Sequence, residues 1–385
     1  MTITLDTLRR FAVARSLFKP VSLKRAFERL PFVQADPIRA PARAQDLTLR
    51  HRAVDYRAGD LERRYATLGI EEDVFINYGF VSASLHALMH PRHDSKDWSP
   101  SRRKRAQVVL EFVRARGEVH PREVDEHFSH GRVTNYWGGS SNATTFLLDA
   151  MHYRGLVRVT RREHGVRVYA AREPRPAQSV DLGPAEQLDA LVDVLVAIYA
   201  PIPAPSLSPM VSRLRYAVPQ RRGELKGALV RAKQRLANAR VDGVDWYWSG
   251  GERPDRFETT EAVRLLAPFD PVVWDRARFE RLWGWAYRFE AYTPVAKRKM
   301  GYYALPLLWR DRIVGWGNAA IRDGALQVDC GYIGKRPSDN AFARELDAEI
   351  DRLREFLRPR QPVSPDLHAD ARRQRGRRKT SVRFP

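Results

Sequence analysis

The spacing of apolar side chains predicts that the first two thirds of this chain are mainly helical. Leu5, Leu8, Phe11, Ala12 and Leu17 recur with a period near that of a helix that has one buried face. Similar stretches follow, and capping residues, glycines or prolines mark their ends. Ser22 should cap the second helix, and Ser140 or Ser141 should cap the helix that begins at residue 143. We therefore expect helices at 4–16, 23–30, 38–52, 60–68, 102–116, 121–128, 143–154, 185–199, 207–216 and 222–237.

Alternating patterns between these helices predict extended segments. Leu156 to Arg172 alternates apolar with basic residues around Gly165, which is typical of a β-hairpin, and residues 241–249 predict a strand. Helices followed by a hairpin are typical of winged-helix DNA-binding modules. This order recurs three times, and residues 91–101 and 174–183 have the composition of linkers. The expected winged-helix modules are residues 1–97, 98–175 and 183–262.

The pattern changes near residue 265, where strands replace most helices. A helix is expected at 274–282, and apolar or aromatic runs predict strands at 287–292, 302–309, 313–321 and 327–333. Residues 263–335 should form a small antiparallel β-barrel or sheet, followed by a helix within 338–358 and a basic, disordered tail at 359–385. The predicted fold is α+β, with tandem winged-helix (helix-turn-helix) modules and a C-terminal small antiparallel β-barrel.

Composition narrows the classes of function. The chain has 385 residues, of which 43% are hydrophobic, so it can form several cores. Its formal net charge of +21 points to an anionic partner, usually nucleic acid and more rarely an acidic membrane surface. No stretch is apolar enough to span a bilayer, so we expect no membrane partner. Cys330 is the single cysteine, which excludes an intrachain disulfide and a cysteine-built zinc site and suits a reducing cytoplasm.

Residues 32–37, with the sequence FVQADP, carry the main candidate chemistry. Pro37 disfavours the α conformation at Asp36, and side chains two apart in an extended segment project to the same side. Gln34 and Asp36 should therefore point together. Asp followed by Pro is also a common helix start, with Asp at the N-cap and Pro in the first turn. Both interpretations stay open on these residues alone.

Three stretches together resemble the winged-helix interstrand-crosslink repair DNA glycosylases, the YcaQ/AlkX/AlkZ-like family. The first contains a Gln-apolar-Asp sequence similar to that family's catalytic motif, and the other two are longer and more specific. The likeness covers about residues 5–335 as an order of modules. The stretches are FVQADP at 32–37, LAPFDPVVWDR at 266–276 and EAYTPVAKRKMGYYALP at 290–306.

The resemblance implies hydrolysis of the N-glycosidic bond of N7-alkylated purines, including crosslinked purines, with Gln34 and Asp36 as the catalytic pair. Asp36, kept ionised by a helix N-terminus, would stabilise the oxocarbenium-like sugar and accept a proton from a water that Gln34 holds. Such a monofunctional glycosylase requires no cofactor and no metal. Relatives carry a His-Glu-Ala-Ser run where this chain has FVSAS at 80–84, which predicts a different lesion preference.

Several residues are candidates for contact with double-stranded DNA. The run at 297–299 should form a hairpin tip that contacts phosphates or enters the minor groove. Asn142 and Thr144 lie on the expected recognition helix of the second module, where they could contact bases, although such helices also pack between modules. The predicted DNA-binding residues are Arg39, Arg43, Asn142, Thr144, Lys297, Arg298 and Lys299.

Other side chains favour structural roles. His86 and His90 have helical spacing with His93 nearby, but Pro91 interrupts the helix and no carboxylate ligand is evident, so we predict no metal. The aromatic run at 246–248 favours sheet packing over base stacking.

Two classes of function remain open on the sequence. The first is a DNA repair glycosylase that acts as a monomer in the cytoplasm, associated with the nucleoid. The alternative is a non-catalytic winged-helix DNA-binding protein, for example a transcription regulator, which should have a dimer surface and a sequence preference.

Overall fold

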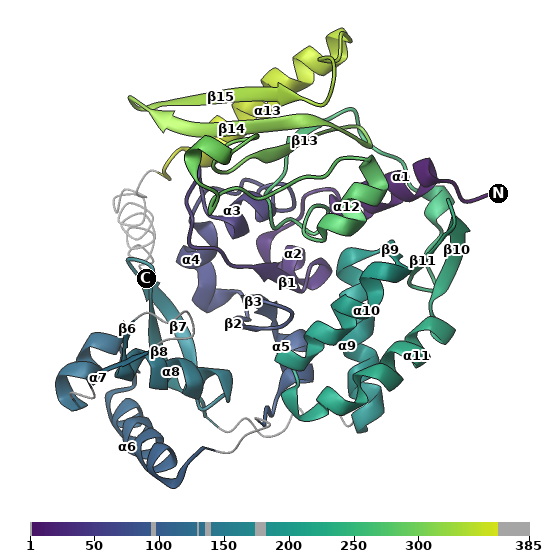
Figure 1. Cartoon of the computed structure of the whole chain (residues 1–385). Helices are drawn as coiled ribbons and strands as arrows, with labels where there is room; N and C mark the ends of the chain where they lie inside the picture. The colour runs from purple at the N-terminus through teal and green to yellow at the C-terminus, as the bar shows by residue number, and fades with distance from the viewer. Residues whose placement is uncertain (1, 94–97, 129–130, 135–139, 174–181, 361–385) are drawn as a thin grey trace, which may run out of the picture.

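The computed structural model describes residues 2–93, 98–128, 131–134, 140–173 and 182–360 (Figure 1). The fold is α+β, as expected, and begins with helix α1 (Leu5–Ser16). Three units of similar organisation follow, then a four-stranded sheet and a C-terminal helix. The predicted tail lies outside the described residues from 361 onward. No helix in the described ranges is long and apolar enough to cross a membrane.

The first unit combines short helices with a three-stranded antiparallel sheet in the order β1–β3–β2. Ser22 caps α2 as predicted, but the helix expected at 38–52 begins only at residue 44, because Pro41 disfavours helix at the residue before it. The hairpin at 70–82 was not predicted. The elements are α2 (Leu23–Arg29), β1 (Phe32–Gln34), α3 (Ala44–Leu49), α4 (Asp60–Arg64), β2 (Ile70–Val74) and β3 (Tyr78–Ser82).

The second unit follows α5 (Ala83–Met89) and has its own hydrophobic core. The predicted helix at 121–128 and the hairpin around Gly165 are confirmed. The cap of α8 was expected at Ser140 or Ser141, but Asn142 fills it. The elements are α6 (Pro100–Arg116), β4 (Glu118–Val119), α7 (Pro121–Phe128), β5 (Arg132–Thr134), β6 (Ser140–Asn142), α8 (Ala143–Tyr153), β7 (Val157–Glu163) and β8 (Val166–Ala171).

The third unit repeats the organisation of the first two. The strand expected at 241–249 is instead a hairpin that turns at Asp242-Gly243, and the aromatic run at 246–248 is buried, which confirms its packing role. In each three-stranded sheet the first strand along the chain pairs with the last, and the last also pairs with the middle one, giving β1–β3–β2, β4–β8–β7 and β9–β11–β10, whereas β5 and β6 pair with each other. The elements are α9 (Pro184–Tyr199), β9 (Ile202–Pro203), α10 (Ala204–Arg213), α11 (Leu225–Arg235), β10 (Ala237–Val241) and β11 (Val244–Trp248).

The C-terminal sheet has four strands in sequence order, but it does not contain the strand expected at 287–292, which is irregular. Its first strand is β12, which was not predicted. Since β12 pairs only with β13 and β15 only with β14, the described sheet is a curled half-barrel with two edges rather than a closed barrel. The elements are β12 (Val263–Leu265), α12 (Arg276–Trp283), β13 (Leu305–Trp309), β14 (Arg312–Arg322), β15 (Ala325–Tyr332) and α13 (Asn340–Leu357).

The units are joined into one frame by buried apolar and ionic contacts. One core runs through the first unit, the third unit and the sheet, and α13 packs beside the sheet (Figure 1). The second unit is tied to the first by charge, because Arg162 of β7 donates to Glu72 of β2 over 2.8 Å. Glu72 is buried, so this pair fixes the two hairpins against each other.

Candidate active site

Strand β1 places Gln34 at the junction of the first unit and the C-terminal segment. Gln34 pairs with Gly79 of β3, and a side chain at 79 would lie 2.4 Å from the Val33 carbonyl oxygen, so only glycine permits this approach. Phe80 and Val81 are fully buried opposite β1. They form apolar core under the site and offer it no polar group.

The side chain of Gln34 is oriented by a residue 240 positions later. The Trp274 indole N–H donates to Gln34 Oε1 over 2.7 Å. An indole N–H is a donor only, so it fixes which end of the amide faces it. No described residue accepts from Gln34 Nε2. The Gln34 N–H donors are therefore left for a water or a bound substrate.

The loop that carries Trp274 is fixed by a buried ion pair. The Asp270 carboxylate accepts from the two terminal nitrogens of the Arg52 guanidinium, at 2.7 and 3.0 Å. The Asp270 backbone carbonyl accepts from the backbone N–H of Trp274. Arg52 and Asp270 are completely buried. Arg52 also donates to the Ser16 carbonyl at the end of α1. Asp270 thus joins three distant parts of the chain behind Gln34.

Asp36 is held in a local turn rather than at a helix start. Its Oδ1 accepts from the Ile38 N–H over 2.9 Å, and its own N–H donates to Gln45 Oε1. The next helix begins at Ala44, so the prediction that a helix N-terminus keeps Asp36 ionised is wrong. Burial raises the pKa of Asp36, and the Ile38 N–H offsets part of that increase. The result is a buried carboxyl with a raised pKa, which suits a proton acceptor.

Tyr303 is a site residue that the sequence did not single out. Its side chain is 3% exposed, and its hydroxyl has no hydrogen-bond partner among the described residues. Burial raises the pKa of this hydroxyl, and the nearby Asp36 carboxylate raises it further. The only sequence signal was its position inside the third family-like stretch. Trp274 likewise lies in the second stretch.

The basic run at 297–299 lies in a loop and not at the predicted hairpin tip. The Glu290 carboxylate organises this loop, since it accepts from the backbone N–H groups of residues 299–301. Lys297 and Lys299 are exposed, whereas Arg298 donates to the Thr293 carbonyl and lies over the Tyr302 ring. The loop therefore presents two lysines to solvent on a fixed backbone.

The arginines after the Gln-apolar-Asp sequence differ in availability. Arg39 is exposed, and it makes no hydrogen bond or ion pair with the described residues. Arg43 pairs with Glu62 and lies against Gly165 in the β7–β8 turn. Arg43 thus has a structural role between two units, and Arg39 is the freer cation.

The two candidate base-reading residues of the second unit have structural partners. Asn142 Oδ1 accepts from the backbone N–H groups of Thr144 and Thr145, which makes it the N-cap of α8. Thr144 is fully buried, and its hydroxyl donates to Asp125 of α7. Neither contact supports base recognition, because capping and burial account for both side chains.

A cluster of potential metal ligands includes a residue of β2, which is separated from β1 by β3 in the sheet. Asp73, a carboxylate far from the histidines in the sequence pattern, lies beside His86 and His90, with all three ligand atoms within 4.8 Å of one another. Burial lowers the pKa of His86 to about 2 and also lowers that of His90. The same carboxylate binds the Arg92 guanidinium over 2.8 Å, and this positive charge opposes a cation beside it.

The repeated units and the net charge of +21 are features expected of a protein that acts on nucleic acid. The family model "DNA glycosylase AlkZ-like" matches residues 27–374, and the chain belongs to this family. Among solved structures, the DNA glycosylase AlkZ of Streptomyces sahachiroi is similar, with 14% identity and a TM-score of 0.58 over 93% of this chain and 98% of that chain. That likeness concerns the fold. Family membership supports a DNA repair glycosylase with DNA as its partner.

Proposed function

We propose that this protein is a monofunctional DNA glycosylase that removes N7-alkylated purines, with Asp36 as the base and oxocarbenium stabiliser and Gln34 as the residue that positions water. The observation that carries this proposal is the incomplete hydrogen bonding of the pair. Gln34 Oε1 accepts from the Trp274 indole N–H, and Asp36 Oδ1 accepts from the Ile38 backbone N–H. Gln34 Nε2 and Asp36 Oδ2 have no described partner, so both are free to hold a water.

The proposed reaction needs no strong general acid. An N7-alkylated purine is positively charged, so it leaves as a neutral base and takes the electrons of the C1′–N9 bond. The developing positive charge on the sugar is stabilised by the Asp36 carboxylate in a site with little water. The water held by Gln34 forms the new C1′–O bond and gives its proton to Asp36. The products are a free base and an abasic site in an intact strand.

We infer that the three repeated units are winged-helix modules. The first and third have the order helix, strand, helix, helix, strand, strand, and the second has the same order with the additional β5–β6 pair before its third helix. In each three-stranded sheet the last strand is at the centre. In this arrangement the third helix is the one that docks on DNA, which makes α4, α8 and α11 the candidate docking helices. The +21 charge then acts on the phosphate backbone, and we propose Arg39, Lys297 and Lys299, which are exposed, among the contacting residues.

Crosslinked purines are the second proposed substrate class, because unhooking requires the same bond cleavage. Apolar Phe80 and Val81 at the place of the family's His-Glu support a different lesion preference for this chain. We also expect a monomer that works on the nucleoid in the cytoplasm. The alternative, a non-catalytic regulator, gives no account of a buried Asp36 with a raised pKa beside an oriented amide.

The test is excision from a duplex with a single N7-methylguanine. We expect release of the free base and an abasic site that breaks only after alkali treatment. A nitrogen-mustard crosslink in the same duplex sequence tests the second substrate class. Binding without base release, together with a dimer and a preference for one undamaged sequence, would instead support the regulator.

A further inference from the structure

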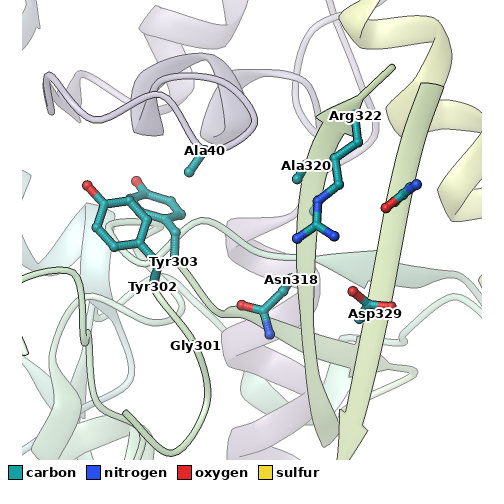
Figure 2. Close-up of a pocket in the computed structure, with 10 residues that line it drawn as sticks. Ala40, Gly301, Tyr302, Tyr303, Asn318, Ala320, Arg322 and Asp329 are labelled. Atoms are coloured by element: carbon teal, nitrogen blue, oxygen red, sulfur yellow. The ribbon is translucent and has the colours of Figure 1, made fainter. Parts of the chain in front are cut away.

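A cavity of about 290 Å³ lies between the turn at Ala40 and the polar face of β14 and β15 (Figure 2). Figure 2 shows Tyr302 and Tyr303 side by side at one side of it, with Arg322 and Asp329 across from them. This volume is at the small end of the range for ligand pockets, roughly 300–1,000 Å³. A single nucleobase with its substituent is the kind of ligand that such a space admits.

The cavity lies next to the proposed catalytic carboxylate. Tyr303 lines the cavity and lies close enough to Asp36 for that carboxylate to raise its pKa. Ala40, four residues after Asp36, lines the cavity as well. A base in this space would therefore lie beside the group that we propose to act on its sugar.

Strand alternation supplies the cavity with polar side chains. Asn318 lies opposite Asp329 and Ala320 opposite Gln327, and all four line the cavity. Of the alternate residues, Val328 packs against the core, and Ala319 is part of the core and also borders the cavity. The Asn318 side-chain N–H donates to the Met300 carbonyl, and Asn318 Oδ1 faces Gly301. Any side chain at position 301 would clash with this oxygen. The wall is thus preorganised for hydrogen bonding.

The aromatic side of the cavity offers stacking. Tyr302 is 44% exposed, and the Arg298 guanidinium lies 5.1 Å from its ring centroid. The Tyr303 hydroxyl is buried and has no partner in the described chain. A stacked purine would gain contact with these rings, and its polar edge would supply acceptors for the Tyr303 hydroxyl.

The charged side chains that line the cavity narrow the class of ligand. Asp329 is exposed and makes no ion pair with a described residue, although the chain carries a net charge of +21. An unneutralised carboxylate in such a protein repels DNA phosphates but attracts a cationic base. Arg322, on the same face, has the donors that suit the O6 atom of guanine.

We propose that this cavity receives the N7-alkylated purine base itself and that Asp329 selects for the positive charge of that base. This proposal rests on the proposed glycosylase function. Normal purines are neutral and bring no positive charge to Asp329, so the carboxylate gains nothing from them beyond the Arg322 guanidinium already in the cavity. Damage would then be distinguished by charge in the cavity, while Gln34 and Asp36 act on the sugar.

The test measures binding in the inactive Asp36→Asn background, with duplexes that differ by one N7-methylguanine. Adding Asp329→Asn should reduce the preference for the damaged duplex roughly tenfold and leave the affinity for undamaged DNA nearly unchanged. The matched control is Asp323→Asn, an exposed carboxylate at the turn of the same hairpin, outside the cavity lining. This control makes the same charge change and should keep the preference.

A second variant tests the space rather than the charge. Ala320→Leu, which fills the cavity, should slow excision at least tenfold without weakening binding to undamaged duplex. The proposal is overturned if Asp329→Asn changes the preference for the damaged duplex no more than Asp323→Asn does, which would indicate a general effect of protein charge. It is also overturned if Ala320→Leu excises at the wild-type rate. If wild-type protein releases no N7-methylguanine at all, the proposed function fails instead.

Discussion

Trp274 Nε1 lies 2.7 Å from Gln34 Oε1 and joins two segments that are 240 residues apart in the sequence. This bond explains why two of the family-like stretches matter together. The first supplies the amide, and the second supplies the donor that orients it. The Arg52–Asp270 pair supports the bond from behind, because Asp270 holds the backbone of Trp274.

Removing the indole donor should therefore impair catalysis more than folding. Trp274→Phe leaves Gln34 free to rotate, and we expect excision to slow by roughly tenfold, which corresponds to one ordinary hydrogen bond. The control is Trp246→Phe, a buried tryptophan of the third unit whose indole N–H has no described partner. Single-turnover rates at saturating protein compare the two variants. Equal rates would show that Trp274 does not orient Gln34.

Breaking the buried ion pair should destabilise the protein strongly. Asp270→Ala leaves the Arg52 charge buried without its counter-charge, which typically costs about 3–5 kcal/mol. The matched change at an exposed pair, Asp245→Ala opposite Arg240, should cost no more than about 1 kcal/mol. Urea unfolding measures both. A loss at Asp270 as small as that at Asp245 would mean that the pair does not hold the site together.

The pH dependence of excision should reflect the environment of Asp36. Burial raises its pKa in the folded protein, and only the ionised carboxylate can accept a proton. The rate should therefore fall on the acid side, with a midpoint above the ordinary aspartate value of about 3.9. Single-turnover rates across the acid range locate this midpoint. A midpoint of the acid limb at or below the ordinary aspartate pKa would contradict this assignment.

The raised pKa of Asp36 also predicts how the stability of the fold depends on pH. A carboxyl group whose folded-state pKa is raised destabilises the fold above that pKa, and the effect disappears below the unfolded-state pKa. Asp36→Asn should therefore be at least as stable as wild type at neutral pH, and the difference should vanish in acid. Thermal unfolding at two pH values measures this. A large loss of stability at neutral pH would instead favour a structural role.

The two exposed lysines of the 297–299 run should contribute to DNA affinity through phosphates. In Lys297→Gln/Lys299→Gln the dependence of log K on log salt should become shallower by up to about 1.8, since each phosphate contact contributes about 0.9. Lys19→Gln/Lys24→Gln, on exposed positions near the start of α2, makes the same charge change away from the loop. Titrations of an undamaged duplex at several salt concentrations compare them. Equal slopes would remove the loop from the interface.

Local sequence predicted the elements that depend on local rules. The Ser22 cap, the helix at 121–128, the hairpin around Gly165 and the last helix at 340–357 all follow from periodicity and turn residues, and all are confirmed. The prediction of a helix at 38–52 was wrong in its first part, since the helix begins only at residue 44. Pro41 disfavours the helical conformation at the residue before it, despite the apolar spacing. The cap of α8 was missed by one residue, since Asn142 competes well with serine for that position.

The remaining errors came from contacts between distant segments. The aromatic residues at 287–292 suggested a strand, but Phe289 packs between Phe269 and Tyr303 in a loop. Strand β12 is too short to show a period and exists because β13 pairs with it. Trp274 and Tyr303 reach the site only through the fold. Periodicity describes one element at a time, so these partners could not be derived from it.

The most direct measurement is single-turnover excision of N7-methylguanine from duplex DNA by wild type and by Asp36→Asn. The two proteins should bind the damaged duplex similarly, because the substitution keeps the size of the side chain. We expect the variant to lose roughly 10²–10⁴-fold in rate, the usual contribution of a proton-accepting group. Equal excision by a folded Asp36→Asn protein would contradict the assignment of Asp36 as the catalytic base.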